Sequence, residues 1–270
     1  MTSTSRTPVS GGLERMLRRD RMIAIGSLVF VVALSWVYTL SGAGMSMPDG
    51  AMTGGGSAQM SDMMMSRGAW DLEYAALMLI MWCVMMVAMM LPSAAPMILL
   101  YTSLNRKRAD GSLWRVAAFG FAYAVAWAGF SILATGAQWA LEESALLSPM
   151  METSSAYMGG ALLIAAGVWQ LTPLKHACLR HCRAPIVFIV QRWREGVGGG
   201  FLMGLEHGAF CLGCCWVLMA LLFYGGVMNL FWILGLAVYV LLEKTVPAGH
   251  FLSRGAGAFL IAWGVWVISA

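Results

Sequence analysis

The chain alternates long apolar runs with short polar stretches. A helix needs about 20 predominantly apolar residues to cross the hydrocarbon core of a bilayer, and most of the runs reach that length. We identify seven predicted spans, at residues 22–41, 72–102, 114–140, 155–173, 199–223, 226–242 and 251–269. The sixth is short, so six or eight spans also fit the pattern. The sequence therefore predicts an all-α, polytopic helical membrane protein.

The polar stretches indicate how the spans are organised. Residues 1–21 are polar and basic and predict a disordered cytoplasmic tail. Residues 22–41 predict a first transmembrane anchor, 42–70 a flexible, Met-rich outer loop, and 71–270 the helical membrane domain. Within that domain, residues 184–196 combine apolar and basic side chains, which predicts an amphipathic helix on the cytoplasmic surface of the membrane.

The composition supports a membrane location. Of the 270 residues, 60% are hydrophobic and only 11% are charged, which leaves no room for a soluble domain of useful size. Short loops rich in Lys and Arg stay in the cytoplasm, and a cytoplasmic N-terminus leaves only Arg67 facing outward. We expect a multi-pass protein of a bacterial-type inner membrane, in contact with lipid. The net charge of +4 reflects this topology and gives no indication of nucleic-acid binding.

One predicted span carries a cluster of metal-ligating side chains. In GLEHGAFCLGCCWVLMALLF, residues 204–223, a helix places four of them on one face: His207, Cys211, Cys214 and Cys215. Thiolate and imidazole bind soft or borderline ions such as Cu(I) and Zn(II). Three glycines beside this face have the spacing that lets another helix approach closely: Gly200, Gly204 and Gly208. The alternative is that the cysteines act as small hydrophobic residues in a packed helix.

A second cluster follows the fourth predicted span. The sequence LTPLKHACLRHC, residues 171–182, contains His176, Cys178, His181 and Cys182. Two His and two Cys so close together are typical of a compact soft-metal site, and this set also suits Zn(II). The alternative is an interfacial basic helix with incidental His and Cys. All six cysteines fall within spans or on the cytoplasmic side, which favours reduced ligand thiols over disulfides.

Methionine is frequent in the outer loop, which holds Met45, Met47, Met52, Met60, Met63, Met64 and Met65. Thioether sulfur is a soft ligand and suits capture of Cu(I) in an oxidising compartment. A biased linker is the alternative. In the second span, one helical stripe contains Cys83, Met86, Met90 and Met97, and the opposite stripe contains Met78, Met81, Met85 and Met89. One stripe could line a path for the ion and the other face lipid, with Pro92 and Pro96 interrupting the helical hydrogen bonds, as in the broken helices that mark ion sites. The alternative is that Met fills gaps in the packing and the prolines merely kink the helix.

Acidic residues are rare within the predicted spans. Glu206 is either a functional carboxylate, which orients an imidazole or relays a proton, or the partner of an interfacial arginine such as Arg180 or Arg183. For the lone polar residues of the last two spans, including LLEK at 241–244, we expect structural roles. Glu142, Glu143 and Glu152, with Met150 and Met151, are predicted to form a short outer loop that could attract cations, although solvated surface charge is the expected interpretation.

Three motifs together resemble a known family: KHACLRHC at 175–182, HGAFCLGCC at 207–215 and MMVAMMLPSAAPM at 85–97. They are similar to predicted metal-binding integral membrane proteins known as domain of unknown function 2182, a family associated with copper. The resemblance covers roughly residues 70–250. It implies a family core that contains Met85, Met86, Met89, Met90, Pro92, Pro96 and the His and Cys residues of both clusters.

The pattern indicates a metal-binding membrane protein that takes part in copper transfer or delivery across or within the membrane. Candidate ligands are the two His and Cys clusters together with Met86, Met90 and Cys83. Partners would be a periplasmic metal donor or a membrane metalloenzyme acceptor. We find no phosphate-binding glycine loop, serine nucleophile motif or catalytic carboxylate pair, and we expect no enzyme activity. Alternatives are a thiol-redox or electron-transfer protein, a haem protein using His207 and His176, and a structural subunit.

Overall fold

The structure is a computed structural model that describes residues 10–41, 70–106, 112–148, 151–247 and 249–270. Within these residues, every regular element is a helix, and the one isolated β-bridge joins Leu147 to Thr153. The all-α fold class is therefore confirmed. Apart from Trp70, the Met-rich segment at 42–70 lies outside the described residues.

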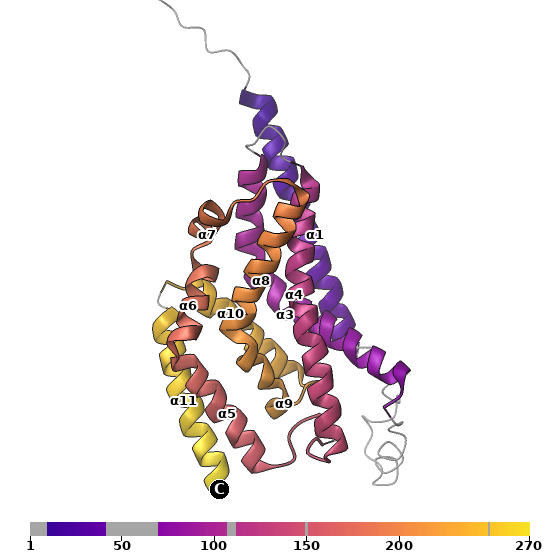
Figure 1. The fold of residues 1–270 in the computed structure, drawn as a ribbon, viewed down its shortest axis with the longest axis vertical. Coiled ribbons are helices and arrows are strands. Elements are labelled where there is room, and N and C mark those ends of the chain that lie inside the picture. The colour runs from indigo at the N-terminus through magenta and orange to yellow at the C-terminus, as the bar shows by residue number, and fades with distance from the viewer. Residues whose placement is uncertain (1–9, 42–69, 107–111, 149–150, 248) are drawn as a thin grey trace, which may run out of the picture.

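The helices form an elongated bundle whose long members run roughly along the long axis of the molecule (Figure 1). The longer helices are α1 (Ser10–Leu40), α3 (Leu72–Arg106), α4 (Leu113–Glu143), α8 (Gly196–Ala220) and α11 (Gly249–Ser269). The shorter ones are α5 (Ala156–Leu171), α6 (Pro173–Arg183), α7 (Pro185–Arg192), α9 (Leu222–Gly225) and α10 (Leu230–Thr245). Helix α1 begins within the segment for which we expected a tail, and α7 lies in the segment expected to form an amphipathic helix.

Length and composition allow five of the described helices to cross a membrane: Met22–Leu40, Leu72–Arg106, Leu113–Glu143, Gly196–Gly225 and Gly249–Ser269. A sixth crossing results if α5 and α6 form one span, bent by 65°. The bend lies at Thr172, which caps α6 by accepting a hydrogen bond from the Lys175 amide, while Pro173 restarts the helix. Helix α10, with 16 residues, is shorter than the five.

Helix α3 differs from its sequence prediction in two ways. It continues through Pro92 and Pro96 without a break, so of the two interpretations the broken helix is wrong. Packing against α1 and α4 holds the helix where two prolines remove backbone hydrogen bonds. The expectation that one methionine stripe faces lipid is also wrong, because both stripes are buried, with Met78, Met86 and Met90 at 0% exposure. Helices α1, α4 and α10 surround α3 and cover its different sides.

Helices α4 and α8 pack together through the three glycines at small-residue spacing. A Cβ atom on Gly204 would lie 2.2 Å from the backbone oxygen of Phe119 on α4, and one on Gly208 would lie 2.5 Å from Cβ of Ala126. At Gly200 the corresponding distance to the Arg115 oxygen is 2.6 Å. The prediction of a close helix partner is confirmed, and that partner is α4.

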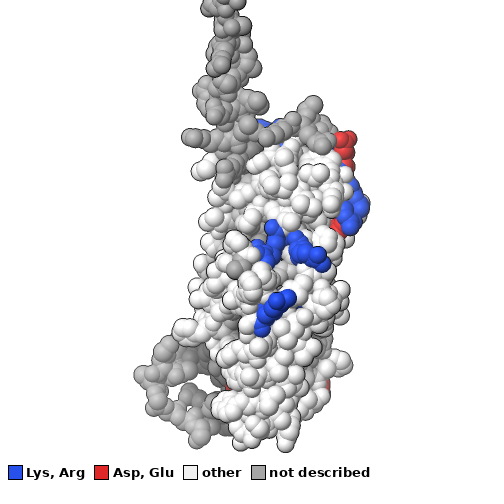
Figure 2. All heavy atoms as spheres, turned by 90° about the vertical axis from the view of Figure 1, so that its left-hand side faces the viewer, with Lys and Arg blue, Asp and Glu red and all other residues white. Residues whose placement is uncertain are grey.

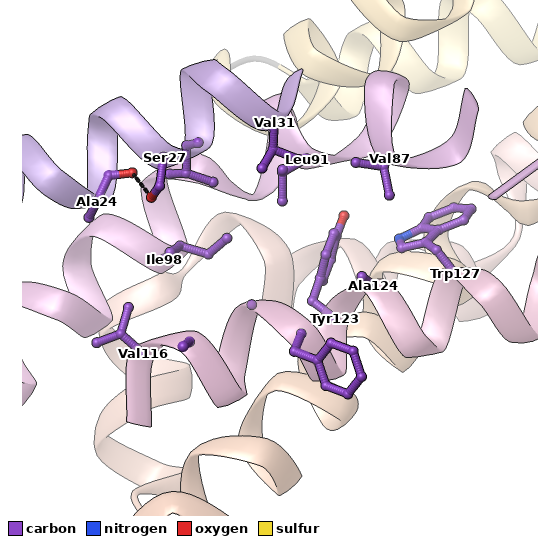
Figure 3. Close-up of a pocket in the computed structure, with 14 residues that line it drawn as sticks. Ala24, Ser27, Val31, Val87, Leu91, Ile98, Val116, Tyr123, Ala124 and Trp127 are labelled. Atoms are coloured by element: carbon purple, nitrogen blue, oxygen red, sulfur yellow. Dashed lines mark hydrogen bonds between the residues drawn. The ribbon is translucent and has the colours of Figure 1, made fainter. Parts of the chain in front are cut away.

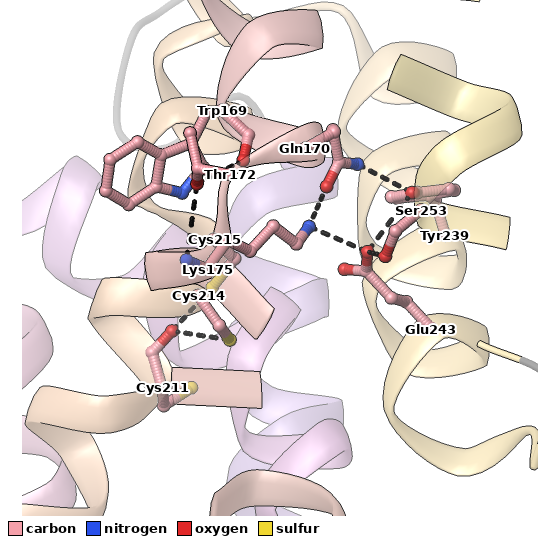
Figure 4. Close-up of polar contacts among 10 residues, drawn as sticks. All are labelled: Trp169, Gln170, Thr172, Lys175, Cys211, Cys214, Cys215, Tyr239, Glu243 and Ser253. Atoms are coloured by element: carbon pink, nitrogen blue, oxygen red, sulfur yellow. Dashed lines mark hydrogen bonds and ion pairs between the residues drawn. The ribbon is translucent and has the colours of Figure 1, made fainter. Parts of the chain in front are cut away.

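A buried polar network joins α5, α6, α10 and α11 (Figure 4). Lys175 Nζ lies 2.7 Å from Glu243 Oε1, and both side chains are fully buried. Gln170 accepts a hydrogen bond from Lys175 and donates one to the Tyr239 hydroxyl over 2.6 Å. Tyr239 and Ser253 both donate to Glu243. Because each charge has several partners, the network fixes how these helices meet without leaving an isolated ion in an apolar interior.

Adding one methyl group at the α4–α8 contact should destabilise the fold. In Gly204→Ala the new Cβ meets a backbone oxygen that cannot move without shifting α4, so we expect a loss of about 1–3 kcal/mol. The matched control is Gly129→Ala on α4, where nothing lies within 4 Å of the added atom. Thermal unfolding of both variants in detergent, followed by circular dichroism, checks this. Equal unfolding temperatures would contradict the close packing.

Removing one member of the buried ion pair should cost more than removing both. Glu243→Leu leaves the Lys175 ammonium buried without its carboxylate, and we expect a loss of about 3–5 kcal/mol. The double variant Lys175→Met/Glu243→Leu removes the unpaired charge and should recover most of that loss. Unfolding in denaturant measures both. A single variant as stable as the double would show that the two charges are not coupled.

Candidate metal centre

Three cysteines of α8 lie together in the protein interior. Cys211, Cys214 and Cys215 are at most 1% exposed. The thiols of Cys214 and Cys215 both donate to the carbonyl oxygen of Cys211, at 3.0 and 2.9 Å. These bonds turn both thiols back toward the preceding helical turn, as expected for residues three and four positions apart. The predicted common face of α8 is thus present, and it faces inward.

Helix α6 adds a fourth thiol to this group. The side chain of Cys182 lies beside those of Cys211 and Cys214, close enough to interact with both. The close approach of α6 depends on Gly213, because a Cβ there would lie only 2.8 Å from the sulfur of Cys178. The two sequence motifs therefore meet at one place, which we call the thiol cluster: Cys182, Cys211, Cys214 and Cys215.

Helix α3 brings a thioether to the thiol cluster. Met90 Sδ lies 4.0 Å from Cys215 Sγ, and Met86 is fully buried one turn earlier on α3. Cys83 is partly exposed and lies two turns before Met90, about 10 Å along the helix axis. Of the three ligands predicted on α3, the structure thus brings Met90 to the cluster, places Met86 next along the helix and leaves Cys83 apart.

A lysine and a tyrosine also contact the thiol cluster. Lys244 Nζ lies 2.9 Å from Cys211 Sγ and 3.0 Å from the Ser93 hydroxyl. The Tyr123 hydroxyl lies 3.1 Å from the same sulfur and donates to the Met90 carbonyl. Sequence reasoning missed both residues. The signal for Lys244 was a charged side chain next to a long apolar run, which is costly inside a bilayer and often functional.

The three predicted histidine ligands have different surroundings. His207, only 3% exposed, stacks on Phe119 and Tyr123, and its Nδ1 has no hydrogen-bond partner among the described residues. It lies one helical turn from Cys211, within reach of the thiol cluster. His181 stacks on Phe210 at 4.1 Å, and its Nδ1 lies 3.0 Å from the Ala177 carbonyl.

His176 lies among charged residues of other helices. Its electrostatic neighbours include Lys175, Arg254, Glu243 and His250, so the structure does not bring it to the thiol cluster. Within the described ranges, no three His, Cys, Asp or Glu side chains are arranged to hold a metal ion. The thiols of Cys214 and Cys215 instead donate to the Cys211 carbonyl, and the sulfur of Cys211 contacts Tyr123 and Lys244, so an ion would have to replace those bonds.

Glu206 forms a salt bridge with arginine, as one of the two interpretations of the sequence predicted. Its partners are not the expected Arg180 or Arg183. Its carboxylate pairs with Arg192, and Arg194 lies 3.9 Å away. Arg183, one of the expected partners, instead donates to the carbonyls of Val246 and Pro247. The contacts of Glu206 tie α8 to the end of α7 and to the segment that follows it, and they give Glu206 a structural role.

A cavity of about 320 Å³ lies between α1, α3 and α4 (Figure 3). Its lining is almost entirely apolar and includes Val31, Leu91 and Trp127. Tyr123 is the residue that the cavity shares with the surroundings of the thiol cluster. Because its walls offer neither thiols nor carboxylates, the cavity is not the metal centre.

Comparison with known proteins identifies the family. No curated protein and no solved structure matches the chain. The family model described as PpoB2, copper chaperone, matches residues 79–267, which is more than half of the chain and includes the whole thiol cluster. The copper association that the motifs indicated is therefore supported. The chain belongs to the PpoB2 copper chaperone family.

Proposed function

We propose that this protein is a membrane copper chaperone that holds Cu(I) at the thiol cluster and passes it to a partner. The observation that carries the proposal is the meeting of thiols from α6 and α8 with the Met90 thioether in an apolar interior. Soft thiolate and thioether donors prefer Cu(I). The family description names a chaperone, which fits a binding role rather than catalysis.

Charge balance supports Cu(I) as the cargo. Cu(I) held by two thiolates carries one net negative charge, which is unfavourable in an apolar interior unless a cation lies beside it. The ammonium of Lys244, 2.9 Å from Cys211 Sγ, supplies that cation. Zn(II) prefers four tetrahedral ligands, and the described His and Cys side chains are not gathered in that way.

The buried methionines of α3 offer a route to the thiol cluster. Between Met78 and Met90, six methionines of this helix are at most 2% exposed: Met78, Met81, Met85, Met86, Met89 and Met90. The two end positions are about 18 Å apart along the axis. Exchange between several weak, soft sites lets an ion move without being trapped. We propose that Cu(I) reaches Cys215 along this helix, and that the Met-rich segment at 42–70 captures it first.

The distribution of charge supports a cytoplasmic N-terminus in an inner membrane. On the face shown in Figure 2, Lys and Arg lie in the upper and middle parts of the molecule, and the lowest part has none in view. Basic ends remain in the cytoplasm. We propose that α10 and the bent pair α5–α6 also lie within the membrane, which gives seven crossings. A periplasmic donor and a membrane metalloenzyme acceptor are the partners that this topology would serve.

Replacing a central thiol should abolish copper retention. We expect Cys211→Ser and Cys214→Ser to lose most bound Cu(I), because each removes a donor from the only place where α6 and α8 thiols are seen to meet in the described structure. Cys83→Ser is the matched control and should retain copper. Elemental analysis of detergent-purified protein, loaded with Cu(I) and challenged with a chelator, measures this. Wild-type copper content in both cluster variants would refute the assignment.

Removing the positive charge beside the cluster should weaken binding. Lys244→Met keeps a similar volume but leaves the copper–thiolate charge uncompensated, so we expect a loss of at least about tenfold in Cu(I) affinity, or about 1.4 kcal/mol. Lys244→Arg, which keeps the charge, should bind more tightly than Lys244→Met. Chelator competition gives the affinities, and thermal unfolding confirms that both variants fold. Equal affinity in Lys244→Met and the wild type would exclude a role for this charge.

A further inference from the structure

We infer that a second site for a soft monovalent cation lies at the far end of α3, built from the thioethers of Met78 and Met151 and the carboxylate of Glu142. These residues come from α3, from the segment before α5 and from α4. The inference rests on the proposed function only in assuming the same cargo, Cu(I), since its ligands are separate from the thiol cluster.

The site is centred on the side-chain amide of Gln138, which is fully buried. Its Nε2 lies 2.9 Å from Glu142 Oε1, 3.3 Å from Met78 Sδ and 3.6 Å from Met151 Sδ. An amide nitrogen has only two hydrogens, yet two sulfurs and one oxygen converge on it. The partly positive nitrogen thus occupies the position that a soft cation would take among these three acceptors.

The orientation of this amide is determined by its other neighbours. The indole nitrogen of Trp82 donates to Gln138 Oε1 over 2.8 Å. Because an indole N–H can only donate, the oxygen of Gln138 must face Trp82 and the nitrogen must face the two sulfurs. Trp70 Nε1 holds the second oxygen of Glu142 at 3.0 Å. The acceptors are therefore held in place, and only the amide has to move to admit an ion.

Met151 reaches this position through an unfavourable backbone conformation. Its φ angle is +56°, in the left-handed region that residues other than glycine rarely adopt. The backbone around it is fixed, since its amide donates to the Ser148 carbonyl over 2.9 Å and its own carbonyl accepts from Val227. The side chain is only 5% exposed. Strain of this kind, held by neighbouring structure, is typical of functional positions.

The location of the site fits an early step in transfer. The start of α3, the end of α4 and the segment before α5 lie at the same end of the bundle, opposite α7 (Figure 1). Trp70 directly follows the Met-rich segment, and Met78 is the first of the buried methionines that lead to Met90. An ion held here would lie between the proposed capture segment and the thiol cluster.

The ligand chemistry selects the charge of the ion. Two thioethers are neutral and one carboxylate carries a single negative charge, so Cu(I) or Ag(I) would form a neutral complex. A divalent ion would leave a net positive charge in a largely buried place, where an uncompensated charge is costly. The sulfur donors exclude the hard monovalent ions Na⁺ and K⁺.

The test counts Ag(I) ions, used as a redox-inert probe, bound to the full-length protein in detergent. We expect Met78→Leu/Met151→Leu to bind one ion fewer than the wild type, because Met and Leu have similar volumes and the fold should persist. The matched control is Met97→Leu/Met203→Leu, which changes two buried methionines near the end of α3 and the start of α8 and should keep the wild-type count. Glu142→Gln should weaken binding of the second ion at least tenfold.

A variant in which serine replaces the four cysteines of the thiol cluster tests this inference separately from the proposed function. With Cys182, Cys211, Cys214 and Cys215 changed to Ser, the ion bound by Met78 and Met151 should remain, and adding the Met78 and Met151 changes should lower the count by one more. If both methionine pairs leave the wild-type count unchanged while the serine changes lower it, the second site is refuted and the thiol cluster stands. If only the methionine changes lower the count, the second site stands and the thiol cluster is refuted.

Discussion

The fold depends on the pairing of charges inside an apolar bundle. Glu243 and Lys244 are consecutive on α10, and both are buried. One faces Lys175 and the other faces Cys211, so a single turn of α10 links the α5–α6 bend on one side to α8 on the other. An unpaired ion in such a place is strongly destabilising. The position of α10 is therefore coupled to the position of the thiols, and the proposed copper site is part of the packing of the bundle.

Glycines bring α4 and α6 close to the part of α8 that carries the thiols. The contact of α8 with α4 leaves no room for a side chain at Gly204, and its contact with α6 leaves none at Gly213. Each close approach puts a side chain of another helix beside Cys211 or its neighbours: Tyr123 from α4 and Cys182 from α6. Motifs that are nearly thirty residues apart in the sequence thus form one cluster. Small residues are the usual means of bringing helices this close in a membrane.

The sequence alone predicted the helices and the shared face of Cys211, Cys214 and Cys215, because both follow from the period of an α-helix. It could not show that both methionine stripes of α3 are buried, since burial depends on which helices surround it. It also could not show that α3 continues through Pro92 and Pro96, because packing outweighs the lost hydrogen bonds. For a similar reason, sequence analysis missed Lys244, Tyr123 and Gln138. The important contacts of each are with residues distant in sequence, and a local sequence pattern does not predict such contacts.

The two proposed sites have different ligands, but the groups around each carry one net negative charge before the ion binds. In the thiol cluster, two thiolates and the ammonium of Lys244 leave one negative charge for the ion to neutralise. At Gln138, two neutral thioethers and Glu142 leave the same single charge. In an apolar interior, where net charge is costly, each site is neutral with a monovalent ion and positive with a divalent one. Discrimination against Zn(II) would then come from charge, and it would hold even if the ligands rearrange as the ion passes.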